Sequence, residues 1–200
     1  MIDYRDNADL FLNPHVETQV LSGDGQSYGL EFYLEKKVGR TTGWLSYTLS
    51  KTTRQIDGIN NDQSYPATYD KLHYLSLLLN YKLSSTWSAS SIFKFSSGGF
   101  ATIPEGTYNY YGAAFNYYTD RNGYKLPTYH RLDLSLNYQS RKNEHRKWKT
   151  EWNFGIYNVY DRKNVFALFI KQDDRKIYSS RAYKMYLFGI TPFVTFNFKF

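Results

Sequence analysis

Strict alternation of apolar and polar residues runs through most of this chain, and it predicts β-strands. In the segment YHRLDLSLNYQ, for example, Leu132, Leu134 and Leu136 fall on one face, whereas Arg131 and Asp133 fall on the other. Similar alternation recurs along the chain. The seven predicted strands are residues 27–38, 44–53, 72–83, 87–96, 129–139, 148–170 (with a bulge near 161–164) and 185–200.

The connections between these strands are alternately short and long. The short ones are residues 39–43, 84–86 and 140–147, and the long ones are 54–70, 98–127 and 172–184. Many of the strands reach about ten residues, the length that crosses a bilayer at a tilt, whereas globular strands average about five or six. Outer-membrane barrels show the same asymmetry, with short periplasmic turns and long external loops. The pattern therefore predicts an all-β, antiparallel transmembrane β-barrel sheet.

Aromatic residues strengthen this interpretation. They make up 20% of the chain, with 21 Tyr and 14 Phe. Those beside the predicted short turns are Trp44, Tyr81, Trp87, Tyr138, Trp148 and Trp152. Such a cluster is typical of the aromatic girdle at a membrane interface. The alternative is that these side chains pack the core and edges of a soluble β-sandwich.

Several other classes of segment are excluded. No run of about 18 apolar residues is present, so a transmembrane helix is excluded. The first residues, MIDYRDNADLF, are acidic and polar and do not form a signal peptide. Because the chain has no cysteine, disulfides and thiolate metal sites are excluded as well.

The net charge of +7 raises the question of an anionic partner. Much of it comes from the segment SRKNEHRKWK, which lies at a predicted short turn. Nucleic-acid binding would need basic residues interleaved with exposed stacking aromatics. We interpret this segment as a solvated turn and expect no nucleic-acid partner.

No set of residues predicts catalysis, a cofactor or a firm metal site, so we do not expect an enzyme. The four histidines (residues 15, 73, 130 and 145) lack metal-ligand spacing. Asp57, Asp62 and Asp70 share one long connection and suggest calcium, but the twelve-residue spacing of a calcium loop with its closing Glu is missing.

Candidate ligand-binding residues lie in the long connections. They are Arg54, Tyr108, Tyr110, Tyr111, Tyr117 and Tyr118. Flat aromatic rings with hydroxyl groups suit sugars, peptides or planar chelates. The alternative is that the tyrosines pack the connection against itself or against its neighbours.

The segment FVTFNFKF ends the chain, with Phe196, Phe198 and Phe200 on one face. Chain ends of soluble proteins are usually polar and exposed, so this aromatic face needs a cover. Lipid would supply one.

Several segments together resemble the C-terminal barrel of TonB-dependent outer-membrane receptors, and most closely the branch common in Bacteroidetes-type bacteria. They are SYGLEFYLEKK, GWLSYTLSKTTRQ, YPATYDKLH, LPTYHRLDLSLNY and NFGIYNVYDRKN. The resemblance extends from about Ile2 to Phe200 and implies the last seven strands of a 22-stranded barrel. It implies that residues 1–26 form an external loop region, and that the plug domain and the TonB-engaging motif lie outside this chain.

The resemblance also implies a location, partners and a function. The location is the bacterial outer membrane, and the partners are its lipid, the rest of the barrel and plug, TonB, and in some cases a surface lipoprotein. It implies that Phe196, Phe198 and Phe200 form a signal for the barrel-assembly machinery. The expected function is TonB-driven import of a scarce nutrient, such as an iron chelate, cobalamin, a glycan or a peptide. The alternatives are a passive porin-type channel and a soluble β-sandwich binding module.

Overall fold

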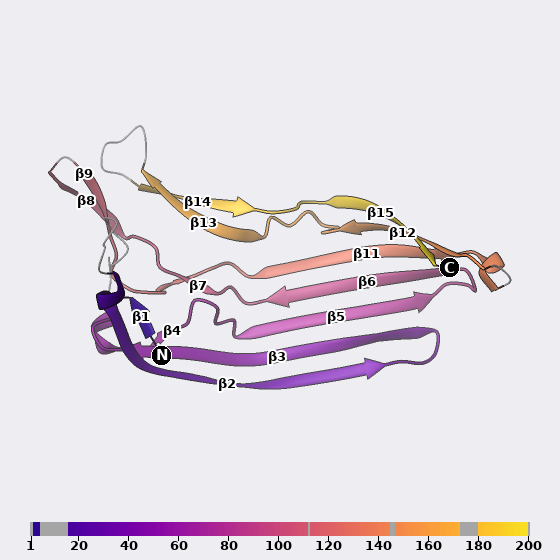
Figure 1. Ribbon diagram of the computed structural model, residues 1–200, viewed down its shortest axis with the longest axis horizontal. Helices are drawn as coiled ribbons and strands as arrows, with labels where there is room; N and C mark the ends of the chain where they lie inside the picture. Colours follow the sequence, from indigo (N-terminus) through magenta and orange to yellow (C-terminus); the bar gives the residue numbers. More distant parts are fainter. Residues whose placement is uncertain (1, 5–15, 112, 145–146, 173–179, 200) are drawn as a thin grey trace.

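The protein is an open antiparallel sheet in a computed structural model, which describes residues 2–4, 16–111, 113–144, 147–172 and 180–199. Its strands lie side by side in nearly sequential order (Figure 1). In that order they are β1 (Ile2–Tyr4), β2 (Val20–Lys36), β3 (Thr41–Ile56), β5 (His73–Lys82), β6 (Trp87–Ser96), β11 (Tyr129–Gln139), β12 (Lys149–Tyr157) and β15 (Thr191–Lys199), with β4 (Tyr65–Pro66) also paired to β3.

The predicted all-β, antiparallel fold is confirmed, because every strand pair of this sheet is antiparallel. Among the described residues β1 and β15 do not pair with each other, so the sheet is not closed into a barrel. Barrel closure stays a prediction. In the described part of the chain, no helix is long and apolar enough to span a membrane.

The short and long connections lie at opposite ends of the sheet, as the sequence predicts (Figure 1). We call these the short-turn end and the long-connection end. The short connections are residues 37–40, 83–86 and 140–148, the last containing the 3₁₀ turn η3 (Arg141–Glu144). Two more 3₁₀ turns, η1 (Val16–Gln19) and η2 (Asn60–Asp62), lie at the other end.

Strand register aligns the apolar residues of all seven long strands on one face. One cross-strand row is Leu34, Leu45, Leu77, Phe93 and Leu132, which are successive partners in the pairings from β2 to β11. The same pattern continues on β12 and β15, where Phe154 pairs with Val194. We call this surface the apolar face.

The opposite face, which we call the polar face, is mostly hydrophilic. There Ser46 pairs with Ser76, which pairs with Lys94, and Lys94 pairs with Arg131. Cross-strand register thus separates the two faces over the whole width of the sheet.

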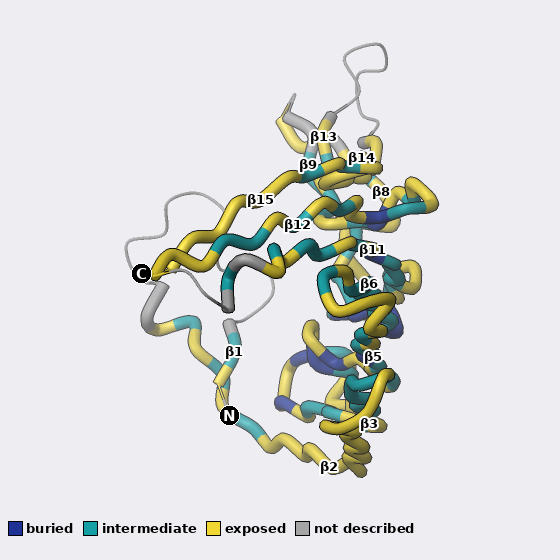
Figure 2. Tube along the Cα trace, turned by 90° about the vertical axis from the view of Figure 1, so that its right-hand side faces the viewer, coloured by how far each residue is buried: buried dark blue, intermediate teal, exposed yellow. Residues whose placement is uncertain are grey.

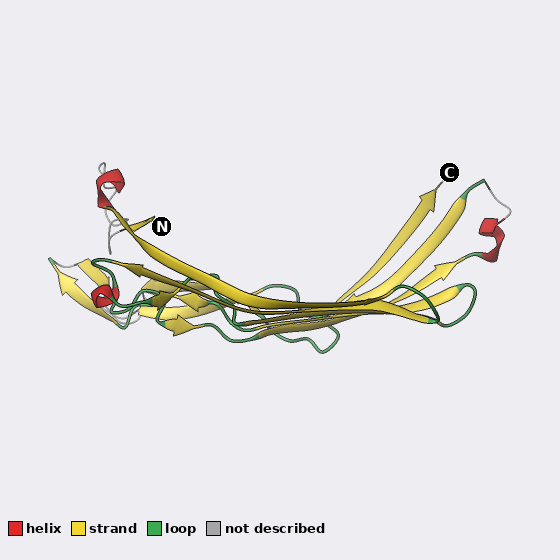
Figure 3. Ribbon diagram, turned by 90° about the horizontal axis from the view of Figure 1, so that it is seen from below, coloured by secondary structure: helices red, strands yellow, loops and turns green. Residues whose placement is uncertain are grey.

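The sheet is a single curved layer with no second layer packed against it (Figure 3). Among the described residues, the buried hydrophobic side chains are Ile56, Ile59, Tyr65 and Ala67, all at the long-connection end. Most of the backbone of the long strands is coloured as exposed or half-buried in Figure 2. By contrast, Leu30 on the apolar face is 68% exposed. The hydrophobic residues of the strands therefore have no protein cover within the described part of the chain.

The structure differs from the predicted strands in three places. Strand β2 begins at Val20, so part of the segment predicted as an external loop (1–26) is strand. Segment 148–170, predicted as one strand, divides into β12 and β13 (Val165–Gln172). The predicted closing strand, residues 185–200, is interrupted between β14 (Ser180–Tyr186) and β15, and most of β14 lies in the segment predicted as a long connection (172–184). Strand β13 pairs with β14, and left-handed backbone at Asn158, Asp161 and Phe188 separates this hairpin from the β12–β15 pair.

The longest predicted loop also contains short strands. Strands β7 (Phe100–Ala101) and β10 (Tyr124–Lys125) pair with each other, and β8 (Gly106–Tyr110) pairs with β9 (Ala113–Tyr117). The β8–β9 hairpin extends outward from the long-connection end of the sheet (Figure 1).

Candidate functional site

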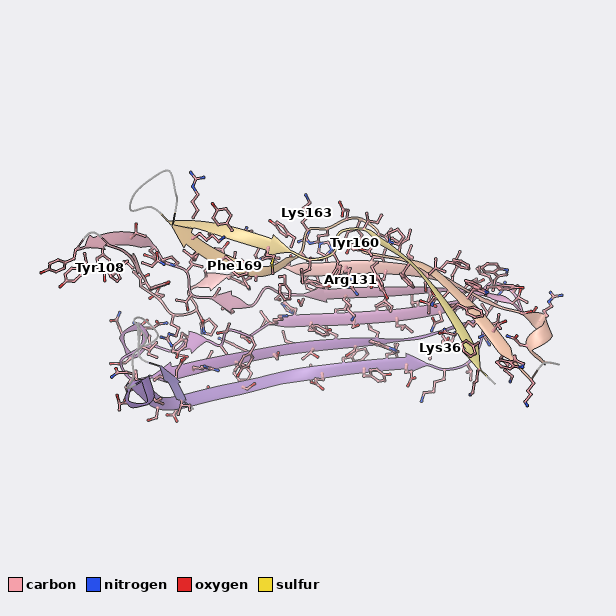
Figure 4. The ribbon with its side chains drawn as sticks, turned by 45° about the horizontal axis from the view of Figure 1, so that its top comes forward. Lys36, Tyr108, Arg131, Tyr160, Lys163 and Phe169 are labelled. Carbon is pink, nitrogen blue, oxygen red and sulfur yellow. The ribbon has the colours of Figure 1, made fainter. Side chains whose placement is uncertain are left out.

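The β8–β9 hairpin carries most of the predicted ligand-binding tyrosines. Tyr108 pairs with Phe115, Tyr110 with Ala113, and Gly106 with Tyr117, so Tyr108, Tyr110, Phe115 and Tyr117 share one face. The three tyrosines are exposed, and Tyr108 lies at the outer end of the hairpin (Figure 4). We call these four side chains the aromatic strip.

The rings of the aromatic strip contact one another but remain accessible. The centroids of Tyr108 and Phe115 lie 5.7 Å apart in a stacked arrangement, and those of Tyr110 and Phe115 lie 6.4 Å apart, edge to face. Tyr111, at the hairpin turn, has φ 51° and is 93% exposed. The rings therefore pack against one another and still present open surface, and ligand binding by these tyrosines stays a prediction.

Tyr118 lies apart from the aromatic strip. Its hydroxyl accepts a 3.5 Å hydrogen bond from the Asn116 side chain, and Asn116 lies on the other face of the hairpin. The structure thus brings four of the five predicted tyrosines, Tyr108, Tyr110, Tyr111 and Tyr117, to the strip or its tip, and leaves Tyr118 outside.

Arg54, the sixth predicted ligand-binding residue, belongs to a different cluster. Its Nη1 lies 3.5 Å from Asp3 Oδ2, and its guanidinium lies 5.7 Å from the centre of the Tyr69 ring. Arg121 Nη1 lies 2.8 Å from the other oxygen of Asp3. Arg54 is therefore held in an ion-pair cluster that joins β1, β3 and the longest connection.

Tyr65 belongs to the same cluster and donates a 3.5 Å hydrogen bond to Asp3. Burial raises the pKa of the Tyr65 hydroxyl above its ordinary value, the Asp3 carboxylate raises it further, and Arg121 and Arg54 act in the opposite direction. The hydroxyl therefore stays protonated at physiological pH and serves as a donor.

Two asparagines hold the long connections together beneath the hairpin. The Asn60 side chain and the Arg121 backbone exchange hydrogen bonds of 2.9 and 2.7 Å. Asn122 is buried, with φ 56°, and its side chain donates to the Pro66 carbonyl at 2.9 Å and accepts from the Thr68 hydroxyl at 3.2 Å. The base of the aromatic hairpin is therefore fixed to the neighbouring connection.

Asn158 organises a second junction, which the sequence analysis interpreted only as a bulge. Its side chain is fully buried and donates to the carbonyls of Arg162 at 2.9 Å and Phe188 at 3.1 Å. Its backbone N–H donates to Asp133 Oδ1 at 2.9 Å. Asp161 accepts from the backbone of Ile190 at 2.9 Å. These contacts join β11, the turn after β12 and the segment before β15.

Residues on the far side of this turn connect it to the start of β11. The Asn164 side chain bonds both the N–H and the carbonyl of His130, at 3.2 and 3.0 Å, as a neighbouring strand would. Tyr160 Oη lies 2.8 Å from His130 Nδ1, on the outer side of the turn near Lys163 (Figure 4). Asparagine and aspartate tolerate left-handed backbone better than most residues. The Asn and Asp residues of the segment NVYDRKN were therefore the sequence signal from which this turn could have been predicted.

The ion pair predicted between Arg131 and Asp133 is present on the polar face. Arg131 Nη2 and Nε lie 2.8 and 3.0 Å from Asp133 Oδ2, and the Asp133 side chain is 7% exposed. Arg131 also borders a cavity of about 360 Å³ with Tyr157, Phe188 and Thr191. Because its guanidinium is occupied by Asp133, we interpret the pair as structural.

The aromatic residues at the end of the chain lie on the apolar face of β15. Phe196 packs against Trp152 with ring centroids 4.6 Å apart, and Phe198 is 58% exposed. Phe200 lies outside the described residues. Its predicted role in barrel assembly, like that of Phe196 and Phe198, stays a prediction.

Within the described part of the chain, no group of three or more His, Cys, Asp or Glu side chains is placed to hold a metal ion. Two of the three carboxylates considered for calcium accept hydrogen bonds from the backbone. Asp62 accepts from Gly58 N–H at 2.6 Å, and Asp70 accepts from Thr52 N–H at 2.8 Å. These two residues therefore stabilise the connection itself.

Comparisons with known proteins add no identification. No protein-family model matches the chain, and neither the curated proteins nor the solved structures contain a match.

Proposed function

We propose that this chain is the C-terminal part of the β-barrel of a TonB-dependent outer-membrane receptor, which binds a scarce nutrient at its external connections and imports it with energy supplied through TonB. The observation that carries the proposal is the uncovered apolar face of a single-layer sheet. Monomeric soluble proteins rarely expose contiguous apolar surface on this scale. In a bilayer, lipid covers that face, and the polar face turns toward the lumen of the barrel.

The connection lengths support the orientation. Three short turns lie at one end and the long, internally hydrogen-bonded connections lie at the other, as in outer-membrane barrels. The short-turn end then faces the periplasm. Trp87 and Trp152, both on the apolar face near that end, occupy the level of an interfacial girdle.

The open edges of the sheet support a larger barrel. β15 pairs only with β12 among the described strands, and β2 has a partner on its outer side only over the residues opposite β1. Unpaired backbone groups are not tolerated in lipid. Further strands of the same barrel would satisfy them.

The aromatic strip supports the proposed binding role. Its exposed tyrosines lie at the end that would face the outside of the cell, on a hairpin whose base is fixed by Asn60 and Asn122. Exposed rings with hydroxyl groups on a positioned hairpin suit a ligand with flat or sugar-like surfaces.

Partitioning of the expressed chain tests the proposal. We expect it to be insoluble in water and to gain a β-sheet circular dichroism spectrum only in detergent micelles or lipid vesicles. A monomeric, cooperatively unfolding β-domain in detergent-free buffer would mean that protein covers the apolar face. That result would contradict both the receptor and the porin-type alternative, and would favour a soluble binding module.

The receptor and the passive porin differ outside this chain. The coding region upstream distinguishes them: a plug domain with a TonB-engaging motif supports the receptor, and a barrel with neither supports the porin.

A further inference from the structure

Two aromatic rings interrupt the hydrophilic surface of the polar face near the Asn158 junction. Register places Phe193 on this face, because it pairs with Gly155, which pairs with Ser135. Tyr157, two residues after Gly155 in β12, lies on the same face. Its ring stacks on that of Phe193 with centroids 4.4 Å apart and is 41% exposed. The polar face thus carries an aromatic surface that strand pairing does not require.

Phe188 borders a cavity together with Tyr157, and its backbone is strained. Its φ is 51°, a conformation that is costly for a bulky side chain, and the residue is 72% exposed. Asn158 holds the conformation, because its side chain donates to the Phe188 carbonyl at 3.1 Å. Burial of the ring therefore does not compensate for the strain. Strained residues of this kind concentrate at functional sites.

The cavity between these groups is the one of about 360 Å³ described above. It is bordered by Arg131, Tyr157, Asn158, Phe188 and Thr191. Register places Arg131 on the polar face and pairs Tyr157 with Thr191, so the cavity belongs to that face. Sites for small molecules have volumes of about 300–1,000 Å³. The cavity therefore has room for a compact ligand with one or two rings.

The charges beside the cavity favour an anion. The Arg131 guanidinium lies 5.6 Å from the centre of the Tyr157 ring, and its Nε and Nη2 are bonded to Asp133. Lys94 lies directly opposite Arg131 in the strand pairing and is half-buried. Within the described part of the chain, Lys94 forms no ion pair. Two cations and one carboxylate therefore leave one positive charge uncompensated.

We propose that this cavity binds a planar aromatic anion, such as an aromatic carboxylate. The ring of the ligand lies between Tyr157 and Phe188, and its negative group points toward Lys94, beside the Arg131–Asp133 pair. Aromatic contacts supply affinity for the flat part of the ligand, and the uncompensated charge selects an anion. The inference goes beyond the proposed function, which places ligand binding at the external connections, and it adds a site on the wall of the lumen.

Titration of the chain with 2-naphthoate tests the site, because this probe is planar and carries one carboxylate. The comparison probes are 2-naphthylmethanol, which is planar and uncharged, and cyclohexanecarboxylate, which is anionic and not aromatic. The full 200-residue chain is titrated in detergent micelles by equilibrium dialysis, and binding to protein-free micelles is subtracted. We expect saturable binding of 2-naphthoate, at least about threefold tighter than that of either comparison probe.

The variant Phe188→Gly separates binding from stability. Glycine adopts left-handed backbone freely, so urea unfolding should show that the variant is at least as stable as the wild type. Because the variant lacks the ring, we expect it to bind 2-naphthoate about three- to tenfold more weakly. If the ring served only the packing of its own segment, Phe188→Gly would lower the stability and leave the affinity unchanged. That result would overturn the inference.

A matched pair of tyrosine variants locates the site. Tyr157→Ile removes the ring at the cavity. Tyr33→Ile removes another exposed ring of the polar face, which stacks on Trp44 with centroids 6.4 Å apart on β2 and β3. We expect the first change to weaken 2-naphthoate binding about three- to tenfold and the second to leave it unchanged. Lys94→Gln should remove most of the preference for 2-naphthoate over 2-naphthylmethanol.

The remaining outcomes distinguish this inference from the proposed function. Absence of saturable binding, or equal losses in Tyr157→Ile and Tyr33→Ile, overturns the inference and leaves the proposed function intact, because partitioning into micelles does not depend on this cavity. Binding of 2-naphthylmethanol as tight as that of 2-naphthoate overturns the proposed class of ligand. A chain that folds in detergent-free buffer contradicts the proposed function, and the same titration in that buffer still tests the cavity.

Discussion

At the scale of single residues, the Asn158 side chain joins the turn after β12 to the segment before β15. It is fully buried, has φ 54°, and bonds three backbone groups through its side chain: the carbonyls of Arg162 and Phe188 and the N–H of Arg162. Asparagine supplies both the amide and the tolerance of left-handed backbone that this position requires. Few other residue types provide both.

Replacement of Asn158 tests this role. We expect Asn158→Ala to destabilise the folded chain by about 2–4 kcal/mol, because buried backbone groups lose partners and a left-handed conformation gains strain. Urea unfolding in micelles measures the free energy, and hydrogen exchange at Ile190 and Thr191 shows whether the segment before β15 opens. Asn158→Gly keeps the backbone conformation and removes only the amide. If Asn158→Ala unfolds like the wild type, the junction is not held by this residue.

Elements differ in how far the sequence predicted them. Strand β11 and strand β6 have the predicted bounds, because alternation there is regular and ends in clear turn residues. The division of β12 from β13 was missed, since Phe154, Ile156 and Val165 belong to apolar runs on both sides of the break. That break is created by hydrogen bonds about 30 positions apart in the sequence, in which Asn158 donates to the Phe188 carbonyl and Asp161 accepts from the Ile190 N–H. The periodicity of the sequence contains no information about these bonds.

The candidate site was predicted in composition but not in arrangement. The run of tyrosines in the sequence identified this connection as a candidate binding segment. Which rings share a face depends on the pairing of Tyr108 with Phe115, which only the structure shows. Arg54 was predicted as a ligand-binding residue, but it contacts Asp3, which is more than 50 residues away in the sequence. Sequence spacing alone contains no information about such a contact.

The β8–β9 hairpin gives a prediction at the scale of one element. If the chain belongs to the proposed receptor, we expect Tyr108→Ser combined with Tyr117→Ser in the intact protein to raise the KM for nutrient uptake roughly tenfold, since each lost ring contact contributes about 0.5–1.5 kcal/mol. Uptake of the labelled nutrient measures KM, and immunoblotting checks the amount of receptor in the membrane. Tyr118→Ser is the matched control, because that side chain lies off the aromatic strip. Equal effects of the two changes would contradict a binding role for the strip.

At the scale of the whole molecule, strand register alone separates the apolar face of the sheet from its polar face. Leu134 and Ser135 are neighbours in β11 but lie on opposite faces. Phe198 lies on the same face as Leu134 but near the short-turn end. The proposed membrane environment therefore predicts that the cost of a charge depends on both face and depth.

A lysine scan measures this dependence. We expect Leu134→Lys to destabilise the membrane-inserted sheet by about 2–4 kcal/mol, and Phe198→Lys by about 0–1 kcal/mol, because the cost falls from the bilayer centre to its interface. Ser135→Lys, on the polar face, is the matched control and should cost little. Unfolding titrations in vesicles measure all three. A protein core instead of lipid would penalise Leu134→Lys and Phe198→Lys alike.

The position of the few buried apolar side chains has a thermodynamic consequence. Ile56, Ile59, Tyr65 and Ala67 are the hydrophobic residues buried within the described part of the chain, and all lie at the long-connection end of the sheet. The heat capacity of unfolding comes mainly from apolar surface that becomes exposed to water, about 12–15 cal/mol/K per residue in soluble domains. If strand residues exchange one lipid contact for another, only this small cluster contributes. The stability of the protein should then vary almost linearly with temperature, and cooling should not unfold it.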